Sequence, residues 1–138
     1  MARFVVDGME ALEMTIEEIA KIPSSVKTEM LNAEADVIVA AQKSVGRQMG
    51  VHDTGQTLDS IKKGKAVITT DGGHIDVSPQ GTRSGSKTRN AEVAFLNEYG
   101  TSRQKARPFM ATANKQYGDR AISRAAQVYE KFLKSKGV

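Results

Sequence analysis

The sequence predicts an α+β fold, a small antiparallel sheet of three to four strands packed by two N-terminal helices and a long C-terminal helix. Two stretches, one in each half of the chain, place apolar residues three and four positions apart, which is the spacing of an amphipathic helix. Between them, over residues 65–77, apolar and polar residues alternate, as is typical of strands. The length of 138 residues indicates one domain, 1–138.

The first part of this domain, residues 1–50, is predicted to hold two helices. The first spans about Asp7–Lys21 and ends before Pro23, which cannot continue it. Its apolar face consists of Met9, Leu12, Ile16 and Ile19. The second helix starts after a cap by Ser24 or Ser25 and ends near Gln48. Its apolar face is rich in small residues and consists of Val26, Met30, Ala33, Val37, Ala41 and Val45.

The second part, residues 51–107, is predicted to begin with a turn at residues 53–55. Thr57 then caps a short turn of helix that buries Leu58 and Ile61. His52, Asp53 and Asp59 include metal-ligating side chains, but no His-x-x-x-His or comparable ligand spacing accompanies them. We therefore expect a structural turn here, with no metal and no cofactor.

A β-hairpin is predicted next, because two β-rich runs flank the turn sequence Asp71-Gly72-Gly73. Pro79 cannot donate a backbone hydrogen bond, so it should close the second strand. Residues 80–90 have no side chain suited to a core and are predicted to form a long, mobile hairpin loop. Residues 91–98 resume an apolar run and are predicted as a third strand.

The third part, residues 108–138, is predicted as one amphipathic helix reaching about Lys134. Pro108 suits its first turn, and Gly118 is expected to bend it. The apolar face consists of Phe109, Ala113, Tyr117, Ile122, Ala125, Val128, Tyr129, Phe132 and Leu133.

The connection before this helix is predicted to be a rigid corner. Gly100 permits a chain reversal that other residues disfavour. We expect Glu98 and Arg107 to pair across the turn, and Tyr99 and Phe109 to anchor its two ends in the core. The corner could equally serve only the fold of the monomer. The bases Arg103 and Lys105, in contrast, are expected at an interface.

The charge is unevenly distributed along the chain, whose net charge is +4. Residues 1–81 hold eight Lys and Arg against twelve Asp and Glu (net −4), and residues 82–138 hold twelve against four (net +8). Such a basic half suits nucleic acid or an acidic protein as partner. Few aromatic residues interleave with these bases, which does not favour binding of single strands by stacking.

The composition also excludes some classes of protein. With no cysteine, neither disulfides nor thiolate metal sites can form. No run approaches the roughly 20 apolar residues of a membrane span, and the acidic start is unlike a secretory signal. From these two observations we expect a soluble protein of the cytoplasm. We find no pair of nucleophile and base and no cofactor loop, and therefore expect that the protein is not an enzyme.

Two motifs carry a resemblance to a known family. "TGQTLDSI" (residues 54–61) and, some forty residues later, "AFLNEYGTSRQKARPFMATA" (residues 94–113) resemble the gene product ten-like family of head-tail joining proteins from long-tailed bacteriophages. The resemblance extends over nearly the whole chain in element order, and its specificity rests on the second motif. The chain departs from the family pattern at Gln56-Thr57 and at Leu96-Asn97.

The resemblance implies a virion protein of the phage neck, a connector or tail-completion subunit that forms a ring, hexamer or dodecamer, between head and tail tube. It also implies a tail-terminator-like fold, a small twisted sheet with helices on one face. On this reading Arg83, Lys87 and Arg89 reach neighbouring neck, connector or tail-tube proteins or the DNA in the channel. Arg103, Lys105 and Arg107, followed by Pro108, position the last helix against an adjacent subunit. The alternatives are a tail-terminator ring that caps the tube and a small basic nucleic-acid-binding protein.

Overall fold

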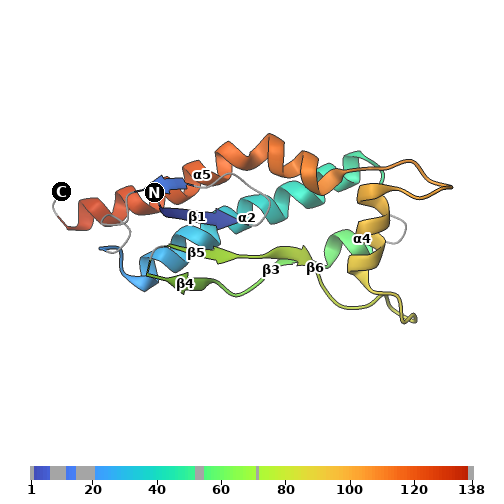
Figure 1. The fold of residues 1–138 in the computed structure, drawn as a ribbon, viewed down its shortest axis with the longest axis horizontal. Coiled ribbons are helices and arrows are strands. Elements are labelled where there is room, and N and C mark those ends of the chain that lie inside the picture. The colour runs from blue at the N-terminus through green and yellow to red at the C-terminus, as the bar shows by residue number, and fades with distance from the viewer. Residues whose placement is uncertain (1, 7–11, 15–20, 52–54, 71, 137–138) are drawn as a thin grey trace.

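The computed structural model describes residues 2–6, 12–14, 21–51, 55–70 and 72–136 and confirms the α+β class. Figure 1 shows an elongated molecule in which two long helices run side by side, with strands along them and a short helix across one end. The elements in chain order are β1 (Ala2–Val6), β2 (Leu12–Met14), α2 (Ser24–Gln48), α3 (Gln56–Asp59), β3 (Ile61–Lys63), β4 (Val67–Thr69), β5 (Gly72–Ile75), β6 (Val77–Pro79), α4 (Asn90–Tyr99) and α5 (Phe109–Ser135).

The helices α2 and α5 form the spine of the fold and run in opposite directions (Figure 1). Alanines on both helices are buried, so the two backbones can approach closely. The side chain of Gln42 on α2 donates to Asn114 Oδ1 on α5 over 3.1 Å. Both helices were predicted by their periodicity. However, the N-cap of α2 is Pro23, without a side-chain cap, and α5 runs unbroken through Gly118.

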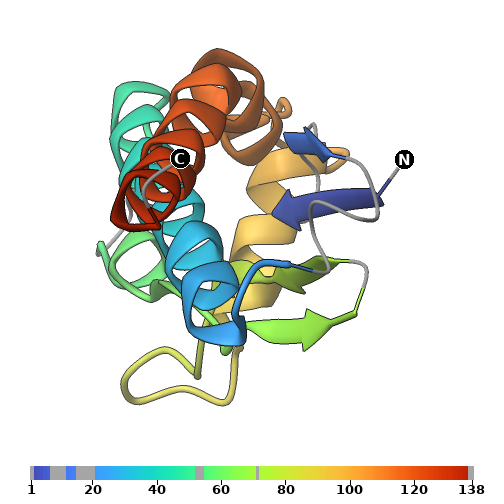
Figure 2. The same ribbon diagram turned by 90° about the vertical axis from the view of Figure 1, so that its left-hand side faces the viewer.

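The strands form two small sheets on one side of the helix pair (Figure 2). The larger has the order β2-β1-β5-β4, with β1 and β5 parallel and the other neighbours antiparallel. The smaller pairs β3 with β6. The predicted hairpin is confirmed, since β4 and β5 pair from Val67 opposite His74 to Thr69 opposite Gly72. The second strand of the hairpin, β5, ends at Ile75 and not at Pro79 as predicted; Pro79 ends the separate strand β6, which pairs with β3.

The predicted first helix, Asp7–Lys21, is wrong at Leu12–Met14. These residues form β2, whose Met14 lies opposite Ala2 of β1. A β-rich segment, β1, is available as a partner, and backbone pairing with it overrides the helical spacing of the side chains. Residues 7–11 and 15–20 of that prediction lie outside the described residues.

The predicted third strand over residues 91–98 is also wrong, because this segment is helix α4. Its buried residues are Asn90 and Ala94, which are four apart and therefore share one face of a helix. The alanines in this segment favour a helix, and the neighbouring strand β6 is already paired with β3.

Two hydrophobic cores lie along the spine. The first joins the N-terminal half of α2 to the C-terminal half of α5 and to β5. The second joins the other halves to α3, β3 and α4, and it positions the corner; its buried members are Ala41, Val45, Val51, Leu58, Ile61, Ala94, Phe109 and Ala113. The predicted burial of Leu58 and Ile61 is confirmed. Ala33 and Val37, predicted on the apolar face of α2, are only partly buried.

Candidate functional site

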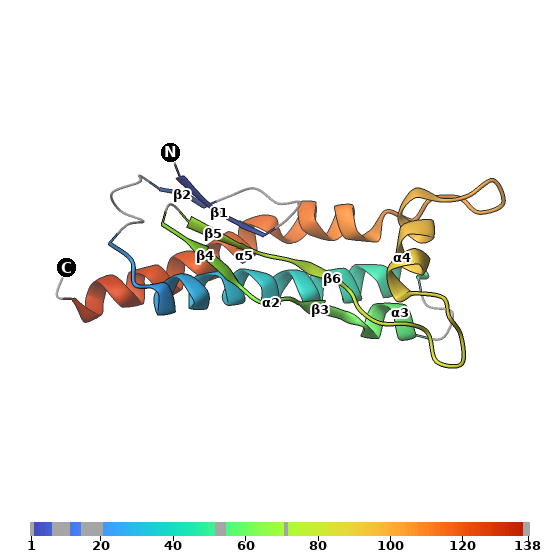
Figure 3. The same ribbon diagram turned by 60° about the horizontal axis from the view of Figure 1, so that its bottom comes forward.

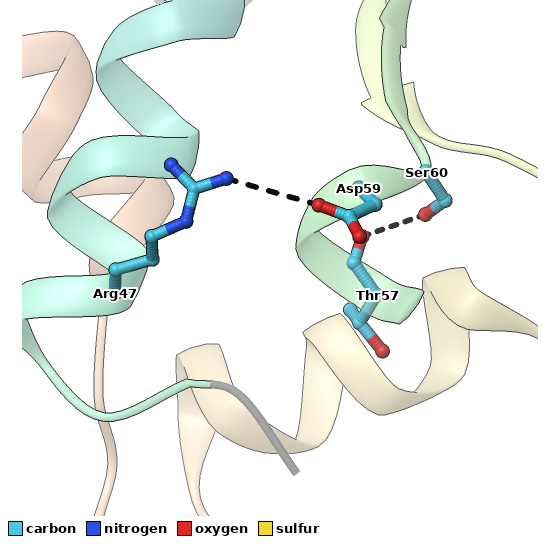
Figure 4. A network of polar contacts seen from close by, with 4 residues as sticks. All are labelled: Arg47, Thr57, Asp59 and Ser60. Carbon is cyan, nitrogen blue, oxygen red and sulfur yellow. Dashed lines mark hydrogen bonds and ion pairs between the residues drawn. The ribbon is translucent and has the colours of Figure 1, made fainter. Parts of the chain in front are cut away.

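Residues 55–61 of the first motif include α3, which contacts α2 through the ion pair in Figure 4. Arg47 and Asp59 form an ion pair of 3.7 Å between exposed side chains, which contributes little to stability. Ser60 Oγ donates to the carbonyl of Thr57 over 2.6 Å. The predicted cap by Thr57 is wrong, because Gly55, at φ +82°, is the N-cap of α3 and no side chain caps it.

Of the metal-ligating side chains in the predicted turn, the structure describes only Asp59. Asp59 faces Arg47, and no group of three His, Cys, Asp or Glu side chains suited to a metal ion occurs in the part of the chain that the structure describes. His52 and Asp53 lie outside that part.

The long loop after β6 is a small hairpin held against α3. Thr82 and Arg89 form an antiparallel bridge, so the loop folds back on itself, but it leads into helix α4 and not into a third strand as predicted. Ser84 N donates to Gln56 Oε1 of the first motif over 2.8 Å. Lys87 and Arg89 are exposed and Arg83 is partly buried. This hairpin projects at the α4 end of the molecule (Figure 3).

The second motif forms the corner between α4 and α5, where the predicted reversal at Gly100 is confirmed. Gly100 has φ +77° and ψ 178°, a conformation that is essentially restricted to glycine. The loop closes through Arg107 N, which donates to Asn97 O over 2.6 Å, and Thr101 N, which donates to Gln104 O over 2.8 Å. Pro108 is the N-cap of α5, and Phe109 behind it is fully buried, as expected.

Glu98 caps α5, which corrects the predicted pairing of Glu98 with Arg107. Its two carboxylate oxygens accept hydrogen bonds from Met110 N and Ala111 N, each over 2.9 Å. The first N–H groups of a helix have no partner within it, and the helix dipole favours an anion there. A side chain near the end of α4 thus fixes the start of α5.

Replacing Glu98 by Ala is expected to lower the free energy of unfolding by about 1–2 kcal/mol, the usual effect of losing a helix cap. Urea denaturation measures this change. Glu98→Gln is the matched control, because it keeps one acceptor oxygen and should lose less. Equal stability of the Ala variant and the parent chain would contradict the capping role.

Arg107 contacts the end of α2 rather than Glu98. Its Nη1 donates to the carbonyl of Gly50 over 3.1 Å, whereas the side chains of Arg103 and Lys105 are exposed. We expect Arg107→Ala to destabilise the protein by about 1 kcal/mol, since it leaves that contact unmade. Lys105→Ala should be neutral. Equal melting temperatures for the two variants would contradict this distinction.

Tyr99 is not an anchor in the core, contrary to the prediction. It is 69% exposed, and its ring lies 4.7 Å from that of Phe95, which is 61% exposed. Leu96, at 47%, completes an outward-facing surface that we call the α4 patch (Phe95, Leu96 and Tyr99). Among residues 21–51, 55–70 and 72–136, the only other exposed large apolar side chain is Val67. The chain holds just seven aromatic residues, three Tyr and four Phe, so two of them at one exposed spot indicate an interaction surface.

A groove of about 500 Å³ continues the α4 patch toward α5 and β6. Its apolar lining includes Pro79, Ala94 and Met110, and Gln42 lies at its inner side. Gln42 Oε1 is buried without a hydrogen-bond partner, while the side-chain amide of the same residue donates to Asn114. The groove therefore adds apolar surface next to the α4 patch.

The alternation of residues in a strand would have separated Phe95 from Leu96, so the strand prediction concealed this patch. The usable signal was the helical spacing of Asn90 and Ala94, which leaves Phe95, Leu96 and Tyr99 on other faces. The four bases Lys87, Arg89, Arg103 and Lys105 are exposed in the two loops that flank α4.

Comparison of the chain with protein-family models, with curated proteins and with solved structures finds no match. Among the described helices, none has the length and apolar character needed to cross a membrane. The geometry places an exposed apolar patch on α4, next to the corner that fixes the start of α5.

Proposed function

We propose that the chain is a structural subunit of the phage neck, which assembles into a ring and joins or completes the connection between head and tail in the virion. The observation that carries this proposal is the α4 patch, two aromatic rings and a leucine exposed on a helix at one end of the molecule. Such residues are typical of the centres of protein interfaces.

The motif that resembles the head-tail joining family is the segment that holds this patch in place. Glu98 binds the first turn of α5, Gly100 makes the reversal, and Arg107 reaches the end of α2. Residues that fix a helix this firmly leave its outer face rigid, which lowers the entropic cost of association. A ring needs no further chemistry, because one interface repeated about an axis closes it. A tail-terminator ring would use the same surface.

A nucleic-acid-binding role is the alternative, favoured by the four exposed bases beside α4. Binding to phosphates would weaken steeply with salt. Association through the α4 patch, in contrast, should persist in salt, because apolar burial drives it.

The variant Phe95→Ala/Tyr99→Ala is expected to weaken self-association by at least about 2 kcal/mol, the loss of one interface hot spot. Sedimentation velocity over a concentration series measures this as a roughly thirtyfold or greater rise in dissociation constant. Val67→Ala removes the exposed apolar side chain outside the patch and serves as control. Unchanged association of the double variant would contradict the proposal.

A further inference from the structure

A second surface lies along the spine and includes no residue of α4. A groove of about 660 Å³ lies between α2 and α5 and reaches the middle of both helices, since its lining extends to Ala40 on α2 and to Arg120 on α5. We call it the α2–α5 groove; its apolar lining is Ala33, Val37, Ala40 and Val128. Glu29 and Asp36 lie on its α2 side, and Arg120 and Arg124 on its α5 side.

We propose that the α4 patch of one copy docks into the α2–α5 groove of the next copy. This inference rests on the proposed ring and assigns its second surface. The shapes agree, because an exposed helix with Phe95, Leu96 and Tyr99 on one side is the type of element that enters an apolar groove between helices. The small side chains of Ala33 and Ala40 leave room for aromatic rings.

The charges around the two surfaces are complementary. The loop after α4 carries the exposed bases Arg103 and Lys105, and the α2 side of the groove carries the exposed acids Glu29 and Asp36. One oxygen of Asp36 is 2.7 Å from Lys63 Nζ, so Glu29 is the freer acid.

On the other side of the contact, Glu92 is exposed on α4, one turn before Phe95 and on the same helix. It can face Arg124 on the α5 side of the groove. Two pairs of opposite sign then define the direction of docking.

Pairing of two α4 patches with each other is disfavoured by the same charges. Such a symmetric contact would bring the basic loops of both copies together, which costs free energy. It would also stop at a dimer, whereas a contact between two different surfaces continues from copy to copy until a ring closes.

Cross-linking tests this arrangement, since the chain has no cysteine of its own. Leu96→Cys and Ala40→Cys chains are mixed in equal amounts and treated with a short bis-maleimide, and light scattering records the mass of each sample before treatment. We expect a cross-linked dimer in the mixture, more than about tenfold above either variant alone, because docking raises the local concentration of the two thiols. Lys65→Cys replaces Ala40→Cys in the control mixture, since Lys65 is equally exposed but lies outside the groove. A chain with both cysteines should give a ladder that ends at the ring.

The outcomes separate the two proposals. Multimers in light scattering with cross-links equal to the Lys65→Cys control would overturn the groove as partner surface but leave the ring. Dimers of Leu96→Cys alone would show α4 pairing with itself and would also overturn the inference. A monomer at every concentration, alone and with neck or tail proteins, would overturn the ring itself.

Discussion

Gly100→Ala is expected to lower the free energy of unfolding by about 2–4 kcal/mol, the largest effect of any small substitution in the corner. Gly100 adopts φ +77° and ψ 178°, which a residue with a Cβ rarely reaches. A Cβ here would also lie 2.7 Å from Ala106 N and 2.9 Å from Gln104 O, which are backbone atoms of the same loop. The corner must open, and Glu98 then loses its alignment with α5.

Urea denaturation measures this loss, and Gly85→Ala is the matched control. Gly85 also has a positive φ of +72°, but a Cβ there meets nothing within 4 Å. Gly85→Ala should lower the free energy of unfolding by only about 1–2 kcal/mol, because it adds backbone strain without a steric clash. If both variants lost the same stability, the close contacts at Gly100 would have no role. We further expect Gly100→Ala, but not Gly85→Ala, to weaken self-association through the displaced α4 patch.

Glu34→Gln is expected to stabilise the protein strongly above pH 8 and hardly at all at pH 5. Glu34 lies on α2, is fully buried, and has no hydrogen-bond partner for either carboxylate oxygen. Burial raises its pKa from 4.5 to about 8. Lys27, two turns earlier on the same helix, does not compensate it, because its ammonium group donates to Thr69 O over 3.0 Å.

The sign follows from proton binding. Between pH 4.5 and about 8 the folded chain keeps the proton of Glu34 and the unfolded chain releases it, so rising pH favours unfolding. The contribution of neutral Glu34 is complete below pH 4.5 and is lost as the pH rises to about 8, at about 1.4 kcal/mol per pH unit at most. Gln cannot ionise and removes this slope.

Thermal or urea denaturation from pH 5 to pH 9 measures the slope. Glu130→Gln is the matched control, because Glu130 is an exposed glutamate on α5 outside the α4 patch and the α2–α5 groove, and its replacement should leave the pH dependence unchanged. Parallel pH profiles of the Glu34→Gln variant and the parent chain would contradict the buried, protonated state.

The spine was predictable, because α2 and α5 are long enough for their apolar period to dominate. Two of the shorter elements were not, whereas the hairpin of β4 and β5 was. Leu12–Met14 pairs with β1, and Asn90–Tyr99 is a helix, since for a few residues tertiary contacts outweigh local spacing. The core stripe of α2 also differs from the predicted one, which ran through Ala33 and Val37; these residues line the α2–α5 groove.

At the site, the chain reversal at Gly100 and the burial of Phe109 were predicted correctly. The partners of long side chains were not predicted correctly. The Glu98 carboxylate can bind either a cation or the unpaired N–H groups of α5, and the sequence does not show which lies nearer. Tyr99 was wrongly predicted in the core because helix α4 was predicted as a strand. Buried Glu34 stood outside the predicted stripe and gave no signal as a core residue.

The mass of the protein in solution tests the central claim most directly. Light scattering over a concentration series, alone, with candidate neck or tail partner proteins and with duplex DNA, separates the two functions. The ring predicts a discrete multiple of 14.9 kDa, alone or with the protein partner, that resists added salt. A monomer whose mass shifts only with DNA, and loses that shift in salt, would contradict the ring and indicate a nucleic-acid-binding protein.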